Sequence, residues 1–457
     1  MNIITQNLEN EKTVAQTIIN FLKKYRIAKL LRSTGANKSR GIGIAEVFKY
    51  LFALVFTNRT MYMNMLMGTY EAGFAKDTVY RFMNSIHINW IRFTTLLASR
   101  ISNETITTLT GDDRVNVLIV DDTMYTRAGA KKVELVSKIY DHAKKKFNYG
   151  FRLLTLGWSD GNTFLPVNGC LLSTENMKNR VCEAKDIDKR TVGHKRRVFA
   201  QTKAPSVVLS LIEEAKKALI KAQYVLFDTW FCSPSSLIAV QKLGYDVIAM
   251  AKKSIKVHYR FNGKMMPLTE IFRISKKRPG RARYLLSVNV SVDKDGITLP
   301  ARIIYVRNRS NRKDYLAIIT TNMTADENEI IRIYGKRWDI EVFFKVCKSY
   351  LKLSGECRSL SYDAMTAHVA VVFTRYMMLS VQNRIESDDR SLGELFYHFT
   401  DEMADVSWLY AINLLIKTFL DTVSDKFSLT DKVLNELIDV FLSALPVNLR
   451  LLLKVCA

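Results

Sequence analysis

The segment Ile333-Tyr-Gly-Lys-Arg-Trp-Asp-Ile-Glu-Val-Phe-Phe-Lys-Val-Cys-Lys348 is the most informative part of this chain. Polar and charged side chains recur there every three or four residues, so on an α-helix they fall on one face about 80° wide. These side chains are Tyr334, Arg337, Glu341, Lys345 and Lys348. The remaining positions are mostly apolar, whereas an ordinary surface helix has an apolar stripe on a polar cylinder. The pattern predicts a helix whose charged face borders a cleft. One carboxylate among three cations and a tyrosine suits a metal-assisted site that binds a phosphodiester backbone.

Composition limits the class of protein and its partners. The chain has 457 residues, and its 48% hydrophobic content excludes disorder as the main state. Lys and Arg number 68 against 44 Asp and Glu, a net charge of +24. This excess favours a polyanion, with nucleic acid as the first candidate and an acidic membrane surface as the alternative.

The cellular location is predicted from three features. Met1–Glu11 is polar and has no signal-peptide core, and the apolar stretch Ala364–Val381 is interrupted by His368 and Arg375, so no membrane span is expected. The six cysteines have no metal-ligand spacing and are expected to be reduced. We therefore expect a cytoplasmic protein that does not engage a membrane.

Acidic side chains follow two apolar strands. Val115–Val120 leads into Asp121 and Asp122, and Tyr224–Phe227 leads into Asp228. These strand-end acids could meet Glu341 at one edge of a sheet, where hard oxygen ligands favour Mg²⁺ or Mn²⁺. Asp121 and Asp122 compete for one role. A lone Asp after a strand is more often a turn residue, but two such acids together with the striped helix favour a site.

The order of predicted elements indicates an α/β fold with helical regions on both sides. Residues 10–33, 43–58 and 76–102 have helical periodicity, and Ala75–Met83 could begin a recognition helix capped by Asp77 or Thr78, or simply be a packing helix. The long striped helix is expected over Ala325–Leu351. The expected domains are 1–110 (helical, DNA-binding), 111–251 (first part of the catalytic core), 252–315 (β-rich insertion), 316–360 (second part of the core) and 361–457 (helical, dimerisation).

Two basic segments support a polyanion partner. Lys178–Lys203 contains nine Lys and Arg against three acids, and Lys252–Arg283 contains eleven against one, interleaved with Tyr259, Phe261 and Phe272. Phosphate contacts by such residues would make binding strongly salt-dependent. The alternative is that these are solvated surface side chains.

These residues resemble the DDE transposases of bacterial insertion sequences, in the group that cuts and pastes DNA through hairpin ends. The signature of that group is Tyr, two residues, Arg, three residues, Glu, six residues, Lys, and Tyr334, Arg337, Glu341 and Lys348 fit it without a gap. Lys345 also fits. In that group the first catalytic acid precedes a Thr, as Asp122 precedes Thr123, which favours Asp122 over Asp121. Its second acid follows a later strand, as Asp228 does. The resemblance covers about residues 115–375.

The resemblance implies a ribonuclease-H-like mixed-sheet core with an all-β insertion. It implies two Mg²⁺ or Mn²⁺ ions on Asp122, Asp228 and Glu341, and DNA phosphates on Tyr334, Arg337, Lys345 and Lys348. The implied partners are double-stranded DNA, as terminal inverted repeats and target, and a second copy in a synaptic homodimer. The group can hold a flipped base on a tryptophan of the insertion. No Trp lies between Phe231 and Arg337 here, so Trp230 or Trp338, or another aromatic, could serve.

Two other functions share part of this pattern. A structure-selective nuclease of the same fold would have the carboxylates but would not need the Tyr, Arg and Lys stripe. An inactive or domesticated transposase-derived protein would bind DNA without cutting it, and the intact acids argue against that.

Overall fold

The computed structural model describes residues 16–385 and Val433, Glu436 and Val440, leaving out 39, 57–59, 67–71, 112–113, 142–144, 175, 280–281, 309–310 and 312–313. The chain divides into two compact units, one formed by residues 1–24, 53–71 and 390–457 and the other by residues 25–52 and 72–389. In the first unit, residues 16–24 are helical and α4 spans Met61–Leu66. The rest of this description concerns the second unit. Most of the expected C-terminal helical region lies outside the described residues.

The second unit begins with helices, as expected. They are α2 (Ile27–Ser33), α3 (Ile44–Ala53), α5 (Lys76–Met83) and α6 (Trp90–Ile101), followed by a π-helical turn (Ser102–Ile106) and a 3-10 turn (Thr107–Leu109). The predicted helix over 76–102 is broken because Asn89 caps α6, accepting the Arg92 N–H at 3.0 Å. The expected cap of α5 is wrong. Its N-cap is Ala75, which has no side-chain capping bond.

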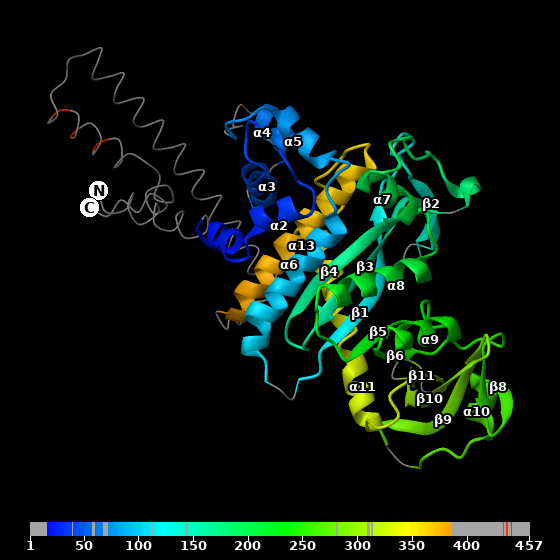
Figure 1. Ribbon diagram of the computed structural model, residues 1–457. Coiled ribbons are helices and arrows are strands. Elements are labelled where there is room, and N and C mark those ends of the chain that lie inside the picture. Colours follow the sequence, from blue (N-terminus) through cyan, green and yellow to red (C-terminus); the bar gives the residue numbers. More distant parts are fainter. Residues whose placement is uncertain are drawn as a thin grey trace. The chain divides into compact units, whose positions relative to one another are not determined.

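A mixed sheet forms the core of this unit (Figure 1). Its strands are β1 (Val117–Thr126), β3 (Lys146–Ser159), β4 (Phe164–Leu172), β5 (Tyr224–Phe227) and β6 (Asp246–Met250). They lie in the order β4-β3-β1-β5-β6, with β4, β3 and β1 antiparallel and β1, β5 and β6 parallel. A short β2 (Ser137–Asp141) pairs with the start of β3. The ribonuclease-H-like prediction is confirmed.

The insertion continues the same sheet. Its strands are β7 (His258–Phe261), β8 (Lys264–Pro267), β9 (Tyr284–Lys294) and β10 (Ile297–Arg307), and β11 (Tyr315–Thr320) joins β10 to β6. The insertion is not entirely β, because α10 (Leu268–Ile274) lies within it. Phe272 of α10 packs on Tyr315 with ring centroids 4.2 Å apart, and Tyr259 is 1% exposed. Tyr259 and Phe272, which belong to the basic segment Lys252–Arg283, therefore pack in the core of the insertion.

Helices cover both faces of the core sheet. They include α7 (Val192–Ala200), α8 (Ala204–Lys217), α9 (Pro234–Lys242) and α13 (Tyr362–Ile385), with a 3-10 turn at Met177–Asn179. Asn168 of β4 donates to Thr95 of α6 at 2.9 Å and to the Leu211 carbonyl of α8 at 3.2 Å. The next residue, Gly169, faces the other way, and a Cβ there would lie 3.3 Å from Phe373 of α13.

The striped segment forms two helices instead of one. They are α11 (Glu327–Gly335), capped by Asp326, and α12 (Trp338–Ser349). At the junction the N–H groups of Lys336 and Arg337 bond to carbonyls three residues earlier, each at 3.0 Å. The tighter turn separates Tyr334 on α11 from Glu341 on α12.

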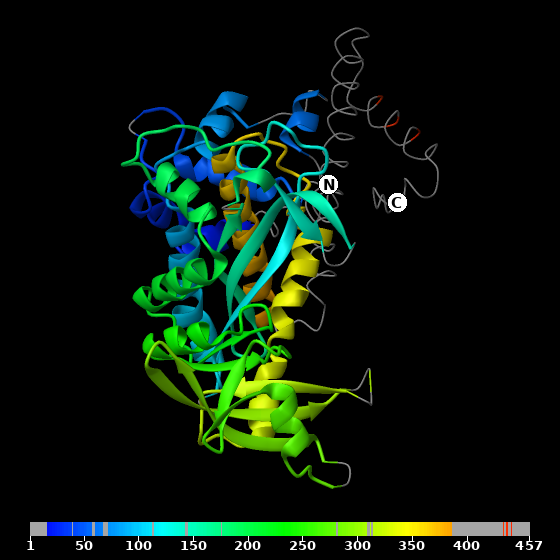
Figure 2. The same ribbon diagram turned by 90° about the vertical axis from the view of Figure 1, so that its right-hand side faces the viewer.

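Helix α13 is long and apolar enough to cross a membrane, but its most apolar window is wholly buried in the protein (Figures 1 and 2). Its arginine at the centre of the helix has partners. Arg375 donates to the Phe52 carbonyl at 3.0 Å and pairs with Glu356 at 2.6 Å. Helix α13 is thus the central helix of a globular core.

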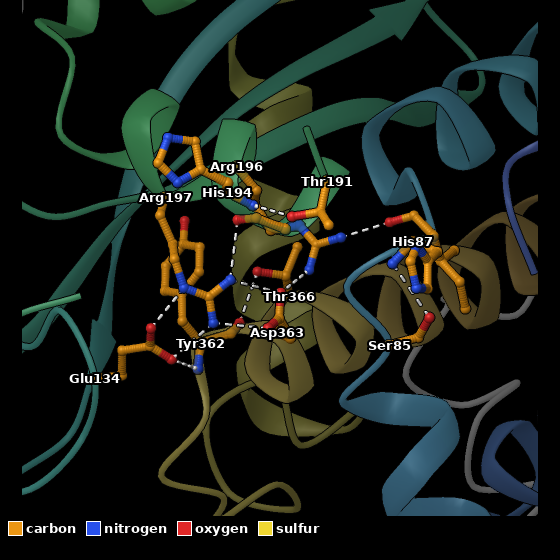
Figure 3. Close-up of polar contacts among 12 residues, drawn as sticks. Ser85, His87, Glu134, Thr191, His194, Arg196, Arg197, Tyr362, Asp363 and Thr366 are labelled. Atoms are coloured by element: carbon orange, nitrogen blue, oxygen red, sulfur yellow. Dashed lines mark hydrogen bonds and ion pairs between the residues drawn. The ribbon is translucent and has the colours of Figure 1, made fainter. Parts of the chain in front are cut away.

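A buried ion network joins α7 to the start of α13 (Figure 3). Arg197 pairs with Glu134 at 2.6 Å and with Asp363 at 2.7 Å, and Arg196 also pairs with Asp363. All four side chains are at most 6% exposed. Arg196 and Arg197 were counted in the basic Lys178–Lys203 segment, but they stabilise the core and do not face a polyanion.

We predict that Asp363→Ala lowers the free energy of unfolding by about 3–5 kcal/mol, because it leaves the buried Arg196 guanidinium without a charge partner and Arg197 with Glu134 alone. Urea unfolding followed by circular dichroism measures this change. Asp188→Ala is the control, since Asp188 pairs with an Arg190 that is 91% exposed, and it should change the free energy of unfolding far less than Asp363→Ala does. Equal costs for the two variants would contradict the structural role of the network.

Candidate active site

The site is built where α12 packs against β1 (Figure 2). Arg337, at the junction that precedes α12, donates to Asp121 of β1 at 3.0 Å and to Glu341 of α12 at 2.5 Å. The Arg337 side chain is 14% exposed, and that of Asp121 is 17% exposed. One guanidinium therefore bridges two carboxylates that lie 220 residues apart in the sequence (341 − 121).

The second strand-end acid lies next to the first. Strands β1 and β5 are parallel, with Val120 opposite Phe227, so Asp121 and Asp228 follow at neighbouring positions. Asp228 accepts the backbone N–H of Trp230 at 2.8 Å. Asp121, Asp228 and Glu341 thus gather at the edge formed by the carboxyl ends of the parallel strands.

Burial dominates the electrostatics of Asp121. It raises the pKa of Asp121 to about 7, against the opposing effects of the Asp122 backbone N–H and of Arg337, and the charges of Asp228 and Asp122 raise it further. Burial also raises the pKa of the Tyr334 phenol, with Arg337 lowering it and Asp228 raising it. Tyr334 therefore belongs to the same cluster and is a neutral hydrogen-bond donor.

Asp122 points to the opposite side of β1, because successive side chains of a strand alternate. It pairs with Arg152 of β3 (Nε to Oδ1, 3.2 Å), and the Arg152 guanidinium lies 4.1 Å from the centroid of the Trp230 ring. The sequence favours Asp122 as the first acid, whereas the geometry places Asp121 with Arg337 and Glu341. The Asp-Thr pattern gives no information on which side of the strand each carboxylate faces.

The other residues of the signature lie along α12. Lys348 donates to Thr123 at 2.5 Å, on the same side of β1 as Asp121, and Lys345 is exposed. Trp230 is 48% and Trp338 63% exposed, so both could stack on a base. Arg152 could not be recognised as part of this cluster from the sequence. Its one signal is that it is the only charged residue of the mostly apolar run Phe151–Trp158.

The chemistry of the donors fits a hard divalent cation, because all three acids offer carboxylate oxygens. Among the described residues, no group of three His, Cys, Asp or Glu side chains is arranged to hold a metal ion. Arg337 instead supplies positive charge between two of the three carboxylates. A metal ion there would take over a charge-neutralising role that Arg337 has in this structure.

Comparison with known proteins identifies the family. Residues 47–299 match the profile of the family described as DDE superfamily endonuclease, which is more than half of the chain, so the chain belongs to this family. The match includes Asp121, Asp122 and Asp228 and ends before Glu341.

No curated protein matches the chain. Among solved structures, the Drosophila P element transposase strand transfer complex is similar, with 9% sequence identity and a TM-score of 0.22. That alignment covers 81% of this chain and 65% of the other, so this chain spans less than two thirds of that protein.

The two candidates for the first acid can be separated by substitution. We predict that Asp121→Asn lowers metal-dependent DNA cleavage by more than about a hundredfold, whereas Asp122→Asn, which loses a pair outside the cluster, lowers it by about tenfold or less. Initial rates of plasmid nicking in Mn²⁺ provide the measurement. The reverse order of effects would favour Asp122 as the metal ligand and exclude Asp121.

Proposed function

We propose that this protein is a DDE transposase. It binds the terminal inverted repeats of an insertion sequence, cleaves DNA at the element ends through hairpin intermediates, and joins the freed 3′-OH to target DNA. The single observation that carries the proposal is the Arg337 bridge between Asp121 and Glu341 beside Asp228. Membership of the DDE endonuclease family supports it independently.

Asp121, Asp228 and Glu341 would hold the metal, two Mg²⁺ or Mn²⁺ ions in the proposed active state. Bound there, the ions supply activation of an attacking oxygen and stabilisation of a leaving oxygen. Asp122, which the sequence favours as the first acid, is the alternative metal ligand in place of Asp121.

The cationic residues next to the carboxylates have separate tasks. Arg337 can pair with a phosphate through its planar fork, while Lys345 and Lys348 on the exposed side of α12 attract the DNA backbone as point charges. The neutral Tyr334 phenol donates a hydrogen bond to a phosphate oxygen. These four residues hold the strand so that its scissile phosphate meets the carboxylate edge.

The remaining parts of the proposal concern the assembly. The N-terminal region 1–110 would bind DNA, the core parts 111–251 and 316–360 would cut it, with the insertion 252–315 between them, and 361–457 would form a synaptic homodimer. Trp230 or Trp338 would stack on a base extruded at the hairpin, since both rings are exposed. We propose a cytoplasmic protein that associates with DNA.

The decisive experiment incubates the protein with Mg²⁺ and DNA that carries the inverted repeats flanking its gene. A transposase gives hairpin ends and joined products on denaturing gels. Nicks or cuts without joining would indicate a structure-selective nuclease, and a mobility shift without cleavage would indicate a domesticated DNA-binding protein.

We predict that Glu341→Gln abolishes cleavage, by more than about a hundredfold, because the amide cannot replace a carboxylate ligand. Binding to the element ends should change by less than about threefold, since Glu341 makes no favourable contact with phosphate. Glu329→Gln on the exposed side of α11 is the matched control and should cleave normally. Normal cleavage by Glu341→Gln would refute the metal assignment.

A further inference from the structure

A cavity of about 800 Å³ lies in the helical N-terminal part of the second unit, away from the carboxylate site. Its walls are residues 35–38 and 40–42, the start of α3, and one side of α5 with the turn that follows it. Pockets that bind small ligands are typically 300–1,000 Å³, so this one can accommodate a group as large as a nucleotide.

The rim of this cavity is cationic. Lys38, Arg40 and Arg81 line it and are exposed, and no Asp or Glu occurs among its described lining residues. The acids nearest in sequence, Glu46 and Asp77, belong to α3 and α5 but do not line the cavity. Since no carboxylate neutralises the three cations within the cavity, the rim favours an anion such as a phosphate.

The lining face of α5 is distinct from its packing face. Thr78, Arg81 and Phe82 of α5 line the cavity at spacings of three and four, which is one side of a helix, and Ser85 lines it from the turn that follows α5. The buried residues of α5, Val79 and Met83, lie off this stripe. Helix α5 therefore packs into the core with one side and presents a cation, a hydroxyl and an aromatic ring with another, and the turn after it adds the Ser85 hydroxyl.

The floor of the cavity is fixed by close backbone contacts. The Thr34 carbonyl accepts the Asn89 N–H at 2.7 Å. Gly35 has φ +101°, and a Cβ there would lie 2.2 Å from the His87 carbonyl oxygen. Only glycine allows this approach, so the floor exists before a ligand binds.

We propose that this cavity holds one nucleotide of a DNA strand. The cations of the rim bind its phosphates, and the base packs on the apolar wall formed by Ile42, Phe82 and Ile88. This inference rests on the proposed function, because it takes DNA as the substrate, and it assigns an unpaired nucleotide to a site separate from the cleaving carboxylates.

The test measures binding without cleavage. Fluorescence anisotropy in EDTA compares a blunt duplex with the same duplex carrying a short single-stranded thymidine tail. The tail should raise the affinity of the unaltered protein about tenfold, the effect expected of one stacked and phosphate-bound nucleotide. Because no metal is present, the result is independent of whether the protein cuts DNA.

Two variants test whether the gain in affinity from the tail comes from the cavity. Ser85→Trp fills the cavity and keeps its charges, so it should remove the tenfold gain but leave the blunt-duplex affinity unchanged. The double variant Lys38→Ala, Arg81→Ala should also lose the gain. Ser85→Ala, and Arg92→Ala at a 56% exposed position outside the cavity, are matched controls that should retain it. Melting temperatures verify that each variant is folded.

A photoreactive tail containing 5-iododeoxyuridine gives a second readout, and its crosslinks should map to residues 35–47 or 78–88. The proposal is overturned if the tail adds no affinity, if both cavity variants keep the gain, or if the crosslinks lie elsewhere.

Competition with free thymidine monophosphate distinguishes a nucleotide within a DNA strand from a free nucleotide as the ligand. A cavity that binds the free nucleotide but not the tail would also overturn the assignment to a DNA strand.

Discussion

The repulsion between carboxylates at one sheet edge is the constraint on which the rest of this structure depends. Asp121 and Asp228 lie next to each other where the parallel pairing of β1 with β5 ends, and Glu341 of α12 is linked to Asp121 through Arg337. Like charges that lie close together destabilise the folded state unless cations lie between them. Arg337 provides that cation from the helix that carries Glu341, so the contact that relieves the repulsion also fixes α12 on β1.

The helix break before α12 makes this contact possible. In one continuous helix, Tyr334 and Glu341 would share a face over two turns. The tighter turn at Lys336 and Arg337 ends α11 and starts a new helix. Behind this junction, Phe343 of α12 packs on Phe373 and Tyr376 of α13 with ring centroids 5.4 and 4.8 Å apart. The apolar face of α12 is thus held by the central helix while its charged face borders the carboxylates.

Much of the fold could be predicted from the sequence because its signals are local. The apolar runs that lead into acids correctly predicted strands β1 and β5. Three features of the structure were not predicted from the sequence. They are the helix α10 inside the insertion, the break between α11 and α12, and the burial of Arg196 and Arg197. A basic residue looks the same in a sequence whether it faces DNA or pairs with a buried Asp363.

The same limit applies to the choice between Asp121 and Asp122. Neighbouring residues of a strand face opposite sides, so a shift of one position exchanges the environments of the two carboxylates. The sequence gives the position of the pair but not its rotation about the strand axis. That rotation follows from what each side packs against, Arg337 and Lys348 of the α12 segment on one side and Arg152 with Trp230 on the other. Both carboxylates thus have a guanidinium partner, and only the Asp121 partner also contacts Glu341. The link from Asp121 through Arg337 to Glu341 is therefore what distinguishes the proposed catalytic edge from an ordinary surface ion pair.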